Sequence, residues 1–138
     1  MFQNRDQIRQ VYVTVWQKLQ QGQLLEPMES LVADVIQLHP EYHSLLDQPE
    51  NAMHEEFDAD SGQSNPFLHM GMHIALREQV STDRPAGIAA IHLKLSAKKG
   101  QHEAEHGMME CLGQALWLAQ RDQTLPDENR YLDCLKQL

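Results

Sequence analysis

Residues that start and stop helices divide this chain into segments of helical length, and they constrain the fold most. Asn-Pro and Pro at a first turn favour a helix start, and Gly after a last turn favours its end. Between them, apolar residues recur every three or four positions. Helices are expected over residues 4–21, 27–38, 40–46, 65–80, 81–100, 101–121 and from 126 onward. We therefore predict an all-α chain, a compact helical bundle of five to seven helices forming a single domain over residues 1–138.

Two segments leave alternatives open. Residues 47–64 are acidic and rich in turn formers, which predicts a loop, with room for one helical turn around 50–54. Residues 11–15 are rich in β-branched side chains, so a strand is an alternative there. Helix remains the preferred interpretation of that segment, because it is long for a strand and has helix caps at its ends.

Composition narrows the class of protein. The chain has 138 residues, 41% of them hydrophobic, which is enough for one packed core. A formal charge of -9 argues against binding nucleic acid or anionic lipid. No apolar run approaches membrane-spanning length and the N-terminus is polar, so we expect a cytoplasmic protein with no membrane partner. A protein partner or a homo-oligomer is possible. Cys111 and Cys134 lack C-x-x-C spacing, and we expect free thiols.

Histidine is the unusual residue of this chain. Side chains four positions apart share one face of a helix. That spacing occurs three times among the 8 histidines, whereas random placement over 138 positions would give fewer than one such pair. The pairs are His39/His43, His69/His73 and His102/His106. The same spacing is the one that metal sites on helices require.

Helical periodicity places two of these pairs toward the interior. His69 and His73 fall in the apolar arc of their helix, while Arg77 points elsewhere. His102 and His106 lie at the edge of the next apolar face, and Glu105 lies near its middle. A carboxylate on an apolar face is costly unless it is paired or bound to a cation. Glu105 is therefore the strongest anomaly in the sequence.

These positions predict an internal site for a divalent metal ion, zinc, iron or manganese, which could support redox or hydrolytic chemistry. The predicted ligands are His69, His73, His102, His106, Glu105 and Glu110, with His39 and His43 as possible supporting residues. His54 and His92 are interpreted as incidental. Two motif matches are weak: Glu103-x-x-His106 is half of a di-iron device, and residues 102–106 read as the H-x-x-E-H of much larger zinc proteases.

Two other function classes stay open. One is a metal-free helical module that binds another protein and holds its histidines in core hydrogen bonds. The other is a pH-responsive switch, with a folding or association transition near the histidine pKa.

Three strings of the sequence carry a resemblance to a known family. They are residues 39–43 (HPEYH), 65–73 (NPFLHMGMH) and 102–112 (HEAEHGMMECL). They resemble a bacterial family of uncharacterised proteins, domain of unknown function 1841, over nearly the whole chain. The resemblance implies a small single-domain bacterial protein and supplies no activity or catalytic residue.

Overall fold

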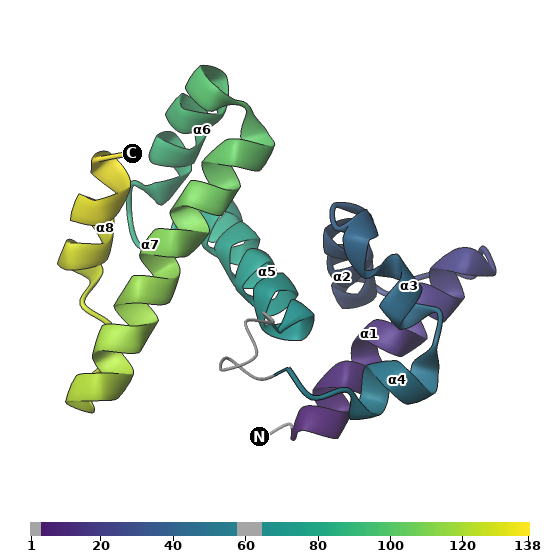
Figure 1. Cartoon of the computed structure of the whole chain (residues 1–138). Coiled ribbons are helices and arrows are strands. Elements are labelled where there is room, and N and C mark those ends of the chain that lie inside the picture. Colours follow the sequence, from purple (N-terminus) through teal and green to yellow (C-terminus); the bar gives the residue numbers. More distant parts are fainter. Residues whose placement is uncertain (1–3, 58–64) are drawn as a thin grey trace. The chain divides into compact units, whose positions relative to one another are not determined.

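The structure, a computed structural model, describes residues 4–57 and 65–138, and within them it contains helices and no strand. The all-α prediction is confirmed. The helices are α1 (Arg5–Gln20), α2 (Pro27–Gln37), a 3₁₀ turn (Pro40–Tyr42), α3 (His43–Leu46), α4 (Pro49–His54), α5 (Pro66–Thr82), α6 (Ile88–Lys99), α7 (Gln101–Asp122) and α8 (Glu128–Lys136) (Figure 1). The described ranges thus contain eight α-helices, more than the predicted five to seven.

Two of the predicted helices begin where a side chain caps an N–H group two or three residues later in the chain. The Asn4 side chain accepts a hydrogen bond from the Gln7 N–H at 2.8 Å, and Gln7 Oε1 accepts one from the Asn4 N–H at 3.1 Å. This reciprocal cap starts α1, so residues 11–15 are helical and not a strand. The Asn65 side chain caps α5 by accepting a hydrogen bond from the Phe67 N–H at 2.9 Å.

The helical turn expected around residues 50–54 is present as α4, which begins at Pro49, and residues 58–64 of the predicted acidic loop lie outside the described part. Two helix boundaries differ from the prediction. Helix α5 continues to Thr82, so the next helix starts at Ile88 and not at 81. The Asp83 carboxylate accepts the Gly87 and Ala89 N–H groups at 3.1 and 3.0 Å, which caps this later start.

The chain divides into two compact units, Met1–Met70 and Gly71–Leu138. In the first unit, α1 packs against α2, α3 and α4. The apolar residues of its core include Tyr12, Val13, Val15, Trp16, Val32, Val35, Ile36 and Leu46. Burying each of the larger of these side chains contributes roughly 1.5–3 kcal/mol.

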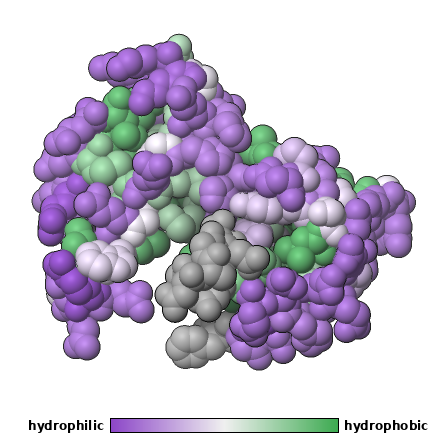
Figure 2. Space-filling view, in the orientation of Figure 1, coloured by the Kyte–Doolittle hydropathy of each residue, from purple (hydrophilic) through white to green (hydrophobic). Residues whose placement is uncertain are grey.

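In the second unit, α7 is the central helix and packs against both α6 and α8. Its core joins apolar residues of four helices, among them Leu76, Ile88, Leu95, Met108, Leu112, Tyr131 and Leu135. Hydrophilic side chains cover most of the face of each unit that Figure 2 shows. In the part of the chain that is described, no helix combines the length and apolarity needed to cross a bilayer.

Candidate functional site

Glu105 is the centre of a buried polar network in the second unit. The residue is 2% exposed on the apolar face of α7, beside Ala104 and Met108. Its Oε1 lies 2.7 Å from Nε2 of His73 and 3.0 Å from Nη2 of Arg77. Both of these partners of Oε1 lie on α5.

The second oxygen of Glu105 has one partner on α6 and one on α7 itself. Oε2 lies 2.9 Å from Nε2 of His92 on α6 and accepts from Nε2 of Gln101 at 3.1 Å. Gln101 is one turn before Glu105 on α7, just after Gly100, whose φ of 88° lets the chain turn from α6 into α7. Both carboxylate oxygens are therefore hydrogen-bonded, as a buried charge requires.

These contacts decide the charge state of the carboxyl. Burial raises the pKa of Glu105, but hydrogen bonds from His73, His92, Gln101 and Arg77 outweigh burial, so the pKa lies well below its usual range. Glu105 is a carboxylate at neutral pH. Each histidine that faces it then presents an N–H, because a carboxylate only accepts hydrogen bonds.

Three imidazoles of the second unit lie close together beside this network. The ring centroids of His73 and His106 are 5.6 Å apart, and those of His102 and His106 are 4.2 Å apart. His73 is fully buried, His106 is half-buried and His102 is exposed. The cluster therefore runs from the core to the solvent. Of the two histidine pairs predicted to converge, three members, His73, His102 and His106, lie in this unit and form this cluster.

Hydrogen bonds orient two of these rings. Nδ1 of His106 is 2.8 Å from the carbonyl oxygen of His102, so this nitrogen carries a proton. In His73 it is Nε2 that carries a proton, which it donates to Glu105. A metal-binding imidazole usually has its other nitrogen anchored on a carboxylate or a carbonyl in this way.

The first unit has a second histidine cluster. The buried His39 ring is 4.8 Å from the His69 ring and 5.3 Å from Tyr42, between centroids, and its Nδ1 is 3.1 Å from Glu41. His43 is turned differently. Its Nε2 is 2.9 Å from the carbonyl oxygen of Ile36.

The two remaining predicted ligands are Glu110 and His69. Glu110 is exposed on α7, and His69 lies on α5 one turn before His73, in the first unit. The ligand roles of His69 and Glu110, and the supporting roles of His39 and His43, remain predictions.

Sequence reasoning missed three partners of Glu105. His92 is predicted to be incidental and Arg77 is predicted to point away from the site, yet both contact the carboxylate. His92 lies four residues after Ile88 and three before Leu95, two buried residues, so its position on the inner face of α6 was detectable from spacing. Gln101 was four residues before an anomalous carboxylate, a spacing at which helix side chains pair.

The prediction of free thiols is wrong. Cys111 of α7 and Cys134 of α8 form a disulfide, with Cα atoms 5.8 Å apart. The two are 23 residues apart in sequence, and the packing of α8 on α7 brings them together. Spacing within the sequence gives no indication of such a pair.

Comparison with known proteins gives a family and no described function. Neither the curated proteins nor the solved structures include a match to the chain. The model of the family described as domain of unknown function (DUF1841) matches residues 4–137, so the chain belongs to this family.

Proposed function

We propose that this protein binds a divalent metal ion at the histidine cluster of its second unit. The proposed ligands are Nδ1 of His73 and Nε2 of His106, with His102 as the third imidazole. The observation that carries the proposal is that His73 and His106 lie 5.6 Å apart with their opposite nitrogens anchored on Glu105 and on a carbonyl oxygen. A separation of this size between ring centroids is compatible with one nitrogen of each ring lying about 2 Å from the same ion.

In this proposal Glu105 supports the ligands. Both of its oxygens already accept hydrogen bonds from four side chains, so its contribution is to orient His73 and to supply negative charge next to the ion. Glu110 and His69 are further candidate ligands. Their place is tested by the same experiments.

Zinc, iron and manganese are the proposed ions, and imidazole-rich ligation suits zinc and iron best. The exposure of His102 and the partial exposure of His106 would let an ion and a small molecule reach the cluster from solvent. We propose redox or hydrolytic chemistry at that ion.

Metal content tests the proposal. The protein is prepared without a polyhistidine tag and incubated separately with Zn²⁺, Fe²⁺ and Mn²⁺. Excess ion is removed, and the bound metal is measured by inductively coupled plasma mass spectrometry. We expect one ion per chain for at least one metal, and its loss in His106→Ala. His54→Ala is the matched control, because the His54 side chain is 72% exposed on α4.

The metal-free helical module is the second candidate, and one observation favours it. His73 and His92 each share a hydrogen bond with Glu105, which would satisfy both rings in the core without an ion. That reading predicts no bound metal in the wild-type protein. Equal metal content in the His106→Ala and His54→Ala proteins would also refute the metal site.

A further inference from the structure

The disulfide of the second unit has one protected and one accessible sulfur. Cys111 is 3% exposed in the core of α7, whereas Cys134 on α8 is partly exposed. Thiol–disulfide exchange begins with attack of a thiolate on one sulfur, and access decides which sulfur is attacked. Cys134 is therefore the sulfur that an external thiol would reach first.

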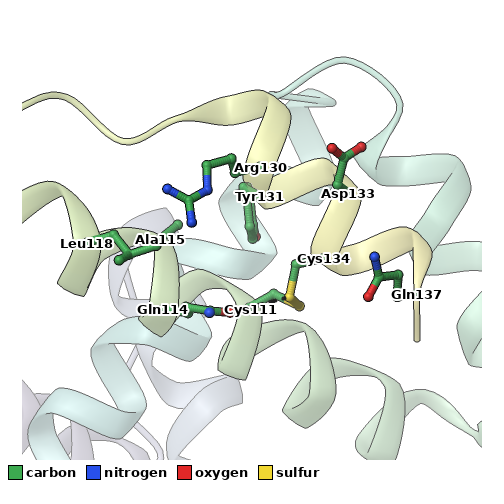
Figure 3. A pocket seen from close by; sticks show the side chains of 9 residues that line it. All are labelled: Cys111, Gln114, Ala115, Leu118, Arg130, Tyr131, Asp133, Cys134 and Gln137. Carbon is green, nitrogen blue, oxygen red and sulfur yellow. Dashed lines mark hydrogen bonds between the residues drawn. A yellow bond between two sulfur atoms is a disulfide. The ribbon is translucent and has the colours of Figure 1, made fainter.

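A cavity of about 310 Å³ adjoins both cysteines (Figure 3). Ala115, Leu118 and Tyr131 form its apolar wall, and the exposed side chains of Gln114, Arg130 and Asp133 form its polar rim. Cavities of this size accept small molecules. The rim carries one positive and one negative side chain, so it suits a zwitterionic compound as well as a neutral one.

We propose that Cys134 is a site of reversible S-thiolation by small-molecule thiols, with Cys111 as the resolving cysteine. The thiolate of the small molecule attacks Sγ of Cys134 and forms a new S–S bond. The Cys111–Cys134 bond breaks, and its electron pair leaves on Sγ of Cys111, which takes a proton from solvent. In the reverse direction, the Cys111 thiolate attacks Sγ of Cys134 and expels the small thiolate. A second small thiol completes reduction by attacking the mixed disulfide, giving the small-molecule disulfide and the Cys134 thiol.

Contacts other than the disulfide also hold α8 in place. Tyr131 is 5% exposed and donates from its hydroxyl to Oε1 of Gln79 at 2.7 Å, and Leu135 is 1% exposed. Oε1 of Gln114 lies 3.8 Å from Sγ of Cys134, where it can accept the S–H of the reduced form. The thiol form therefore has an acceptor and a packed helix, as reversible exchange requires.

The site is tested in the folded full-length protein with reduced and oxidised glutathione as probes. Thiols are trapped with an alkylating agent at set times, and peptides containing residues 111 and 134 are analysed by mass spectrometry. We expect reduced glutathione to open the disulfide without denaturant, with the mixed disulfide on Cys134, and oxidised glutathione to close it again. A disulfide that opens only in denaturant, or a mixed disulfide found mainly on Cys111, would overturn the proposal.

Single-cysteine variants give an independent test. Cys111→Ser is expected to take up glutathione on Cys134 about tenfold faster than Cys134→Ser takes it up on Cys111, because only Cys134 is accessible. Circular dichroism establishes that both variants are folded. Equal rates in two folded variants would overturn the proposal; if one variant fails to fold, the wild-type time course decides.

Discussion

His73 and Glu105 form a buried pair, with Nε2 of His73 2.7 Å from Oε1 of Glu105. The two residues are 0% and 2% exposed, and they join α5 to α7 in the interior of the second unit. A carboxylate in this position fixes which nitrogen of His73 carries the proton. The pair therefore links the stability of this unit to the orientation of a proposed metal ligand.

Replacing Glu105 tests the contribution of this network to stability. Glu105→Gln keeps the size of the side chain but leaves Arg77 without its carboxylate partner. We expect the free energy of unfolding to fall by about 2 kcal/mol, which is less than for a fully buried ion pair because the Arg77 side chain is 24% exposed. Urea unfolding at neutral pH measures this loss. Glu103→Gln, at an exposed position of the same helix, is the control and is expected to leave stability unchanged.

The same variant predicts a pH dependence. The folded-state pKa of Glu105 is depressed, because its hydrogen bonds outweigh the effect of burial, which raises it. Its contribution is therefore fully present above the unfolded-state pKa of about 4.3 and is lost as pH falls below that value toward the folded-state pKa. The stability difference between wild type and Glu105→Gln should shrink in acid. A difference that stays constant from about pH 7 to about pH 3 would contradict this account.

Arg9 is the corresponding buried charge of the first unit. It is 4% exposed, its Nη1 donates to the carbonyl oxygens of Ala52 and Glu55 at 3.1 and 2.8 Å, and its guanidinium lies 4.9 Å from the Phe67 ring centroid. Lysine keeps the charge but loses the planar group. Arg9→Lys should lower the unfolding free energy by about 1–3 kcal/mol.

Arg5→Lys is the matched control for Arg9, since the Arg5 side chain is 44% exposed and its ion pair with Glu56 lies at the surface. Its unfolding curve should overlay that of the wild type. Equal losses in the Arg9 and Arg5 variants would show that the buried contacts of Arg9 add nothing to stability.

The disulfide has its own stability effect. A crosslink between residues 23 positions apart restricts the unfolded chain, so the double variant Cys111→Ser/Cys134→Ser should lose about 3 kcal/mol. The wild-type protein with its disulfide reduced should unfold at the same denaturant concentration as the double variant. A thiol assay confirms that both cysteines are reduced. If the reduced protein then unfolds at the same denaturant concentration as the oxidised protein, the disulfide makes no such contribution.

Helix starts that depend on residues close in sequence could be predicted. Asn4 and Asn65 cap helices through N–H groups two or three positions away, so both starts could be recognised from the sequence. Asp83 shows the limit. It has a positive φ of 51° and caps an N–H group six residues later. Helix α6 therefore begins at Ile88 and not at residue 81, the start expected from the sequence.

The candidate site was predicted only in outline, for a related reason. Periodicity placed Glu105 on an apolar face, and its burial cost required a partner. Which partner it has depends on how α5 and α6 pack against α7, and this packing brought in Arg77 and His92. Cys111 and Cys134 are also brought together by the packing of two helices, so no local sequence pattern could predict their disulfide.

Calorimetric titration of the untagged protein with Zn²⁺, Fe²⁺ and Mn²⁺ tests the central claim most directly. The account predicts one site per chain for at least one of these ions in wild type and in His54→Ala, and binding at least about 100-fold weaker in His106→Ala, since removing a ligand costs at least as much as removing its support. Identical isotherms for the His54→Ala and His106→Ala proteins, or no binding of any of the three ions to the wild type, would contradict it.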